Sequence, residues 1–435
     1  MSDEGKRKRN NSPKKTKVEA NRGLKRICIP IEQDDYQAIV DDPRAYRLML
    51  DEMIGQYPAI FPAEIGQGYK LNGWTPSSQK MPDVRVRRIA LHTLDKAGKQ
   101  PVYNLAPSFV MPYMIGYTAE VEKPLFLHQK FGVPFWGLTY VFGRDDAYWE
   151  RAANSLGGYH LVGTTVQEPD KLPEDLLADE KHTKLNGQKA YIATTVGADC
   201  LLGVSIAPDA GQQSLTEAYR HFKKEAQQVK ADYHPKTVNL DGWLSTYLAW
   251  QSLFPAMTMI LCFLHAFLKI RSCSKRLTDL FPVIGDKVWD IYHAPDEKTF
   301  RSRIAAFAVW GAQNTTGSAL DAIAKLCHKG DDFAKAYDFP AAYRTSNMLD
   351  RHMEPMARFL YCTRYFHGHL MSAEMRIRAW ALAHNFLPYC PRAAIAQTYL
   401  SPAHKLNGFV YRENWLENLL VSASMSGCQP SNKIH

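Results

Sequence analysis

Residues 176–206 read LLADEKHTKLNGQKAYIATTVGADCLLGVSI, and this stretch decides the fold. Asn186-Gly187 is a strong hairpin signal, and Gly197-Ala198-Asp199 marks a second break. The runs between these breaks are rich in branched and aromatic residues, as strands are. The stretch therefore predicts three consecutive strands, paired as an antiparallel meander, at 176–183, 188–196 and 200–206.

The chain after the meander changes from strand to helix and back. Ser214–Lys230 has amphipathic spacing, and Ser214 with Glu217 forms a possible capping box at its start. Lys236–Leu240 is a short fourth strand. Three strands, a helix and a fourth strand are the opening order of the ribonuclease H-like fold. We therefore expect an α/β protein with such a core, which carries a helical insertion and follows a mixed and helical N-terminal region.

This expectation divides the chain into seven segments. They are a basic tail expected to be disordered (1–27), a mixed N-terminal region (28–120), a helix-turn-helix-like module (121–160), the first part of the core (161–271), the helical insertion (272–342), the second part of the core with a long helix over 348–384 (343–400), and a C-terminal tail (401–435). Within the long helix, Pro355 predicts a kink or an early restart.

The segment 121–160 contains three short helical runs separated by glycines. Gly132 and Gly143 occupy the breaks, and Asp145 suits an N-cap. Short helices joined by such turns are typical of a helix-turn-helix module that binds DNA. The alternative is an ordinary helical hairpin that packs a core.

The charge of the chain is concentrated at one end. The formal net charge is +9, but residues 1–27 hold ten Lys or Arg against three acids, so the remaining 408 residues carry only +2. The net charge of the body therefore does not by itself indicate nucleic-acid binding. The tail either keeps the protein soluble or adds non-specific contacts with phosphates.

The start of the chain and its cysteines indicate a cytoplasmic protein. A polar, basic start with no apolar run predicts no signal peptide, and no stretch is long enough to predict a membrane span. Eight cysteines without a C-x-x-C pair suit reduced thiols in the cytoplasm.

Three aspartates stand at positions where they can face a site. Asp179 lies on the first strand, Asp241 ends the fourth strand, and Asp350 lies at the start of a helix. Three converging carboxylates would supply hard oxygen ligands for two Mg²⁺ ions, with Mn²⁺ as a possible substitute. Such a pair of ions activates a water or a 3′-hydroxyl for in-line attack on a phosphodiester.

These residues resemble a known family, the DDE-type transposases of prokaryotic insertion sequences, near the Mutator-like branch. The resemblance covers about residues 120–390 and depends on order and spacing, with 62 residues between the first two acids and 109 between the last two. The matching features are the strand 176–183 with Asn186-Gly187 and Lys189-Ala-Tyr191, Asp241-Gly-Trp243 with Leu253-Phe-Pro255, Cys262-Phe-Leu-His265 as the C-x-x-H signature, and Thr345-Ser-Asn347 ahead of Asp350-Arg351.

The resemblance implies a function and partners. A transposase of this type cuts DNA at its element's ends and joins the 3′-hydroxyl to target DNA, in a process of DNA transposition and recombination. Its partners would be double-stranded DNA, as terminal inverted repeats and target, and a second copy of the chain or more on DNA. Its place would be the prokaryotic cytoplasm, at the nucleoid. A same-fold nuclease and an inactive, domesticated transposase that acts as a DNA-binding regulator are the alternatives.

Two departures leave alternatives for the acids. The family usually has glutamate as the third acid, so Glu354 competes with Asp350. Side chains alternate on a strand, so only one of Asp179 and Glu180 can face the site; Glu180 is the second choice and Asp199 the third.

Four further residues would support the acids. Cys262 and His265 could be a structural pair, part of a zinc site or an ordinary buried pair. Alternatively, His265 could lie near the metals or the scissile phosphate. Arg351 would contact phosphate, and Asn347 belongs to the motif of the third acid.

Overall fold

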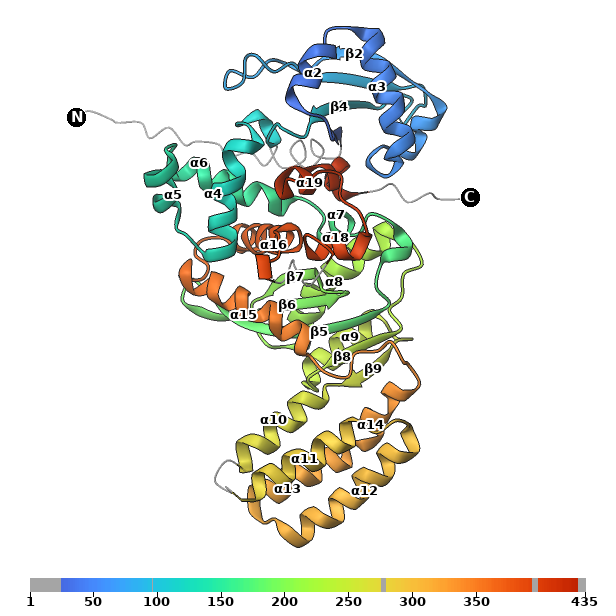
Figure 1. Ribbon diagram of the computed structural model, residues 1–435, viewed down its shortest axis with the longest axis vertical. Coiled ribbons are helices and arrows are strands. Elements are labelled where there is room, and N and C mark those ends of the chain that lie inside the picture. Colours follow the sequence, from blue (N-terminus) through green and yellow to red (C-terminus); the bar gives the residue numbers. More distant parts are fainter. Residues whose placement is uncertain (1–24, 96, 275–278, 393–397, 429–435) are drawn as a thin grey trace, which may run out of the picture.

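The structure is a computed structural model that describes residues 25–95, 97–274, 279–392 and 398–428. It is a mixed α/β protein with two sheets (Figure 1). A four-stranded sheet belongs to the N-terminal part, a five-stranded sheet forms the middle, and a bundle of helices projects at the other end. Residues 1–24 of the expected basic tail lie outside the described residues.

The central sheet has the strand order β7-β6-β5-β8-β9. The first three strands form the predicted antiparallel meander, and β8 and β9 run parallel to β5. The predictions of three strands and a fourth are confirmed, and β9 adds a fifth at the edge. The bounds are β5 Asp175–Leu185, β6 Gln188–Gly197, β7 Cys200–Ala207, β8 Thr237–Leu240 and β9 Thr258–Leu261.

Helices cover both faces of this sheet (Figure 1). On one face, α8 (Gln212–Val229) and α9 (Leu244–Leu253) bury Leu176 and Ala178 of β5 in a shared core. On the other face, α15 (Asn347–Cys362) and α16 (Leu370–Phe386) pack on Leu177 of the same strand. Successive side chains of β5 point to opposite faces of the sheet. They are buried on both faces because helices cover each face.

Two local predictions in this core are wrong. Helix α8 begins at Gln212 after Gly211, and the Ser214 hydroxyl donates a hydrogen bond of 2.6 Å to Asp209, so Ser214 and Glu217 form no capping box. The long helix expected over 348–384 is two helices. Pro355 lies inside α15 without ending it, and the chain breaks after Cys362, where Arg364 and Tyr365 take left-handed φ angles of 57° and 66°.

The segment 272–342, expected as a helical insertion, is helical in its described part, and together with α10, which begins before residue 272, it has a hydrophobic core of its own. Phe263, Phe300 and Phe333 meet edge to face or tilted in this core, at centroid distances up to 6.5 Å. It separates β9 from α15 in the chain and forms the lower lobe in Figure 1. Its helices are α10 Phe263–Ser274, α11 Leu280–Tyr292, α12 Glu297–Asn314, α13 Gly317–His328 and α14 Gly330–Ala334.

The N-terminal region is a second sheet with the order β1-β4-β3-β2, flanked by two helices. Its first strand begins at Arg26, so the tail expected over 1–27 is wrong at its end, because Ile27 is buried in the core. The bounds are β1 Arg26–Ile29, α2 Gln33–Ile39, α3 Pro43–Gln56, β2 Tyr69–Trp74, β3 Arg87–Leu91 and β4 Val102–Pro107.

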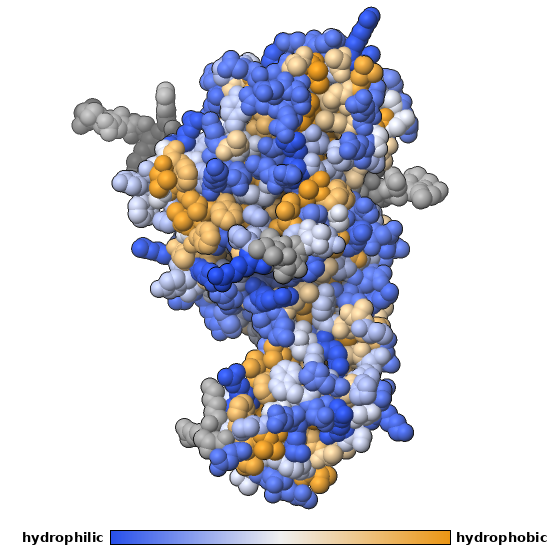
Figure 2. Space-filling model, in the orientation of Figure 1, coloured by the Kyte–Doolittle hydropathy of each residue, from blue (hydrophilic) through white to orange (hydrophobic). Residues whose placement is uncertain are grey.

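The three helices predicted within 121–160 are present as α4 (Thr118–Phe131), α5 (Phe135–Phe142) and α6 (Asp146–Ser155). The Asp145 side chain accepts from the backbone N–H of Tyr148, as an N-cap does. Helix α5 has no charged side chain, and it exposes aromatic and aliphatic groups that form a hydrophobic area in Figure 2. DNA binding by this module stays a prediction.

The expected C-terminal tail over 401–435 is wrong for its described part. Helices α18 (Pro402–Asn407) and α19 (Trp415–Ser422) are packed and mostly buried. Glu417 on α19 accepts hydrogen bonds from Ser108 (2.7 Å) and Thr118 (3.1 Å), which ties the end of the chain to the N-terminal region. Among the described helices, none has the length and apolarity needed to cross a membrane.

Candidate active site

The first two aspartates lie on neighbouring parallel strands. The register of β5 against β8 pairs Leu177 with Asn239. Asp179 follows two residues later within β5, and Asp241 follows two residues later, directly after β8 ends, so the same offset places them side by side at the carboxyl end of β8. Neighbouring strands are about 4.8 Å apart, so the two carboxylates share one location.

Alternation along β5 decides between Asp179 and Glu180. Glu180 points to the α8–α9 face, where its Oε1 accepts hydrogen bonds from Tyr219 (2.7 Å) and Thr246 (2.8 Å). Asp179 points to the opposite face, which α15 covers. Burial raises the pKa of Glu180 to about 7, and its contacts with Tyr219 and Thr246 make it an internal anchor. Asp179 is therefore the acid that faces the site.

The third acid comes from the first turn of α15. Asp350 is exposed, and its Oδ2 accepts a hydrogen bond of 3.0 Å from Ser346. The charge of Asp350, like that of Asp241, raises the pKa of Asp179. Glu354 instead pairs with Arg358 on the outside of the same helix. Between the two alternatives, Asp350 is the one whose charge acts on the other acids.

Asp199, the third alternative for the first acid, belongs to a different cluster. It lies in the β6–β7 turn, within 3.7 Å of basic groups on His352, Arg351 and Lys405. Burial by itself would raise the pKa of Asp199, but these basic groups outweigh that effect and lower the pKa to about 2. Its charge is already balanced, which leaves it no need for a metal ion.

The three site carboxylates, by contrast, form no ion pair with a described residue, although the charge of His265 lowers the pKa of Asp179 in part. Asp179, Asp241 and Asp350 each have one oxygen held by a hydrogen bond, from the backbone of Glu180, the backbone of Trp243 and the hydroxyl of Ser346. Within the described parts of the chain, their second oxygens accept no hydrogen bond and none of the three pairs with a basic side chain. Burial and the neighbouring acids raise the pKa of Asp179 to about 6. The cluster therefore attracts a cation.

Cys262 and His265 lie beside these acids, at the start of α10. Hydrogen bonding of the protonated His265 ring to the Cys262 sulfur raises the pKa of His265 to about 9, against the effect of burial, and the charges of Cys262, Asp179 and Asp241 add to this. Burial would raise the pKa of the Cys262 thiol, but His265 and Ser346 lower it below its usual value. Nδ1 of His265 is buried and has no hydrogen-bond partner of normal geometry among the described residues. The pair is thus polarised, and the imidazolium lies near enough for the charges of Asp179 and Asp241 to raise its pKa.

A cationic cavity of about 210 Å³ opens next to Asp241. Cys262 and His265 line it together with three exposed lysines from the insertion, Lys269, Lys325 and Lys329. None of these lysines forms an ion pair with a described residue. A negatively charged ligand would meet three lysines here, against the single carboxylate of Asp241, which also lines the cavity. The sequence reasoning missed these lysines, because their positions on α10 and around the end of α13 carry no signal of convergence.

The remaining supporting residues lie at the margin of the site. Asn347 is exposed at the first position of α15, and Arg351 turns toward Asp199, 3.6 Å away. The structure therefore does not bring Arg351 to the three aspartates. Over the described ranges, no three His, Cys, Asp or Glu side chains are gathered closely enough to hold an ion as they stand.

Comparison with known proteins identifies no relative: the chain matches neither a family model nor a curated protein sequence.

Proposed function

We propose that this protein is a DDE-type transposase that cuts DNA with a ribonuclease H-like core. The observation that carries the proposal is the convergence of Asp179, Asp241 and Asp350, each with a free carboxylate oxygen, beside a lysine-lined cavity. The strand order β7-β6-β5-β8-β9, with the last two strands parallel to the first of the meander, supports the same reading, since it places acids of β5 and β8 at one edge.

The donor set fits Mg²⁺. Hard divalent cations prefer carboxylate oxygens, and three such oxygens at the site have no partner among the described residues. Asp179, Asp241 and Asp350 would hold the ions after the side chains move together, since among the described residues no three such groups are close enough as they stand. Bound Mg²⁺ would activate the attacking hydroxyl and stabilise the charge that develops on the phosphate.

The chain's own groups have separate tasks in this proposal. The hydrogen bonds from Glu180, Trp243 and Ser346 orient the three carboxylates before any ligand arrives. His265, as an imidazolium, would offer positive charge to the phosphate beside Asp241. Lys269, Lys325 and Lys329 would hold the strand's next phosphates, as basic side chains hold a DNA backbone.

The test is a metal-dependent cleavage and strand-transfer assay on a DNA fragment that contains the gene's flanking sequence on both sides. Wild type is expected to cut and to join 3′-ends into a target plasmid with Mg²⁺ or Mn²⁺. Asp179→Ala, Asp241→Ala and Asp350→Ala should each lose both steps and keep DNA binding. The matched controls are Asp232→Ala and Glu354→Ala, two exposed acids outside the site, which should keep full activity.

The outcomes separate the alternatives. Cutting without joining would make the protein a nuclease of the same fold. DNA binding without cutting in wild type would make it a regulator. Cutting that survives in Asp241→Ala would overturn the proposed site itself.

A further inference from the structure

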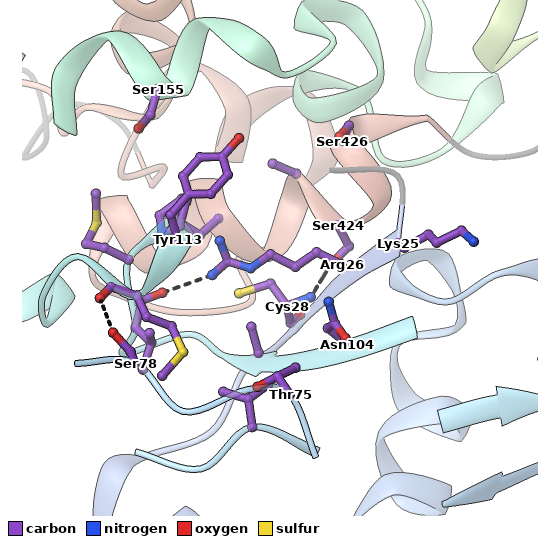
Figure 3. A pocket seen from close by; sticks show the side chains of 18 of the residues that line it. Lys25, Arg26, Cys28, Thr75, Ser78, Asn104, Tyr113, Ser155, Ser424 and Ser426 are labelled. Atoms are coloured by element: carbon purple, nitrogen blue, oxygen red, sulfur yellow. Dashed lines mark hydrogen bonds between the residues drawn. The ribbon is translucent and has the colours of Figure 1, made fainter. Parts of the chain in front are cut away.

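A second, larger cavity shares no lining residue with the cavity beside the three aspartates. Its volume is about 930 Å³, within the range of ligand sites. It opens between the N-terminal sheet, the 3₁₀ turn Pro112–Met114 and the 3₁₀ turn Ser424–Gly427 that follows α19 (Figure 3). The candidate active site makes no use of this cavity.

Positive charge lines the cavity without any acid. Among the described residues, Lys25, Arg26 and Arg88 contribute to the lining, and no Asp or Glu does. Within the described chain, none of the three basic groups forms an ion pair. A cavity with this lining favours an anionic ligand.

Two buried donors in the lining have no acceptor. Nη1 of Arg26 and Nε of Arg88 are buried and unpartnered among the described residues. Nη2 of Arg26 donates to the carbonyl of Val110 at 3.0 Å, which fixes the guanidinium in place (Figure 3). A buried donor without an acceptor costs about 1–3 kcal/mol, and a phosphate toward which the two guanidinium groups turn from below the cavity surface would remove this cost.

The rest of the lining suits a flat, apolar group. Val86, Val102 and Met111 supply apolar surface. Tyr113 stands in the lining with 74% of its surface exposed, and its φ of 60° is left-handed. Non-glycine residues in this conformation cost about 1–3 kcal/mol and concentrate at ligand sites. An exposed aromatic ring beside phosphate-binding arginines can stack on a nucleobase.

We propose that this cavity binds a nucleotide, with its phosphate on Arg26 and Arg88 and its base against Tyr113. The nucleotide would be either a free mononucleotide or one unit of a DNA strand, since both present the same phosphate and base. The chain's own first 24 residues are a poor occupant, because they hold eight basic and three acidic residues and would meet like charge. The site is independent of the carboxylate site.

The test is calorimetric titration of the full chain with deoxyadenosine 5′-monophosphate, deoxyadenosine and inorganic phosphate. The nucleotide should bind at least tenfold more tightly than either part alone. Arg88→Met should weaken this binding at least tenfold, and so should Tyr113→Ala, which keeps the test valid if one variant folds poorly. Arg47→Met, which removes an equal charge from the exposed face of α3, should bind as wild type does.

A second titration with a single-stranded oligonucleotide identifies the source. Tight binding of the oligonucleotide that Tyr113→Ala weakens, with weak binding of the mononucleotide, assigns the cavity to a DNA strand; the reverse order assigns it to free nucleotide. The proposal is overturned if wild type binds neither the mononucleotide nor the oligonucleotide. It is also overturned if wild type binds inorganic phosphate as tightly as it binds the nucleotide. The two proposals fail separately: wild type that binds nucleotide in this cavity and does not cut DNA would overturn the transposase proposal alone, and wild type that cuts DNA and binds no nucleotide here would overturn this one alone.

Discussion

The backbone N–H of Ser346 donates a hydrogen bond of 3.2 Å to the sulfur of Cys262, 84 residues earlier in the chain. The Cys262 thiol in turn reaches the Ser346 hydroxyl at 3.4 Å, and that hydroxyl donates to Asp350. This short relay connects the start of α10 to the first turn of α15. It joins the two ends of the helical insertion at the point where the third acid must meet the other two.

Ser346→Ala should therefore reduce activity more than it reduces the stability of the fold. The variant loses the hydroxyl that orients Asp350, so Mg²⁺-dependent cleavage should fall by about 10–100-fold, as loss of a group that orients a metal ligand does. The measurement is the cleavage rate over a series of Mg²⁺ concentrations, where the variant should need more metal. Ser272→Ala, an exposed serine on α10, is the control. An unchanged metal requirement would show that the relay does not position Asp350.

Asp179→Asn should make the metal-free protein more stable while it removes activity. Burial and the neighbouring acids raise the pKa of Asp179 to about 6, from a usual value near 3.8. Because the pKa of Asp179 is higher in the folded state, its ionisation destabilises the folded protein above pH 6. This destabilisation decreases as the pH falls toward the pKa of an aspartate in the unfolded chain. The gain should therefore be about 1–3 kcal/mol at pH 7–8 and vanish below about pH 4.

The measurement for Asp179→Asn is the melting temperature between pH 4 and pH 8 in a chelating buffer. Asp232→Asn, at an exposed position after α8, should change little at any pH. Added Mg²⁺ should stabilise wild type, because the ion binds only the folded state, and should stabilise Asp179→Asn far less. A variant that is less stable than wild type at pH 8 would contradict the raised pKa described for Asp179.

The lysine-lined cavity should contribute to DNA affinity through phosphates. Replacing Lys325 and Lys329 together with glutamine should weaken DNA binding without dependence on base sequence. The slope of log affinity against log salt should fall by about 0.9 for each lysine that contacts a phosphate of duplex DNA. Lys298→Gln, an exposed position on α12, is the control, and an unchanged slope in the double variant would exclude the cavity from the DNA path.

The ion pair between Glu225 of α8 and Arg378 of α16 should be needed for stability. Its side chains are only 11% and 13% exposed, and Arg378 also donates to the carbonyl of Tyr159. Arg378→Ala leaves the buried carboxylate of Glu225 without its cation, with only the backbone N–H of Val162 still donating to it, and should cost about 3–5 kcal/mol. Chemical denaturation measures the loss.

The exposed pair of Glu354 and Arg358 provides the comparison for that ion pair. Its side chains are 68% and 56% exposed, so Arg358→Ala should cost at most about 0.5 kcal/mol. Equal losses in Arg358→Ala and Arg378→Ala would show that burial does not decide the effect.

Local patterns predicted most of the central sheet and the helices of the insertion. The hairpin at Asn186-Gly187 and the alternation along 176–183 depend on neighbours within a few residues, which the sequence displays directly. The errors fell where a tertiary contact competes with a local rule. Ser214 bonds to Asp209 instead of capping α8, and Pro355 is accommodated inside α15.

By itself, the sequence determined the strands, the helices and the choice of Asp179 and Asp241, because an acid on or at the end of a strand is a local feature. Only the tertiary structure decided which acids share a site, because Asp350, Glu354 and Asp199 differ in what surrounds them and not in their local pattern. The same holds for the lysines beside Asp241 and the arginines of the large cavity. Charges from segments that are distant in the sequence act together only where the fold brings them close. The local periodicity of the sequence does not indicate how far apart such segments lie in space.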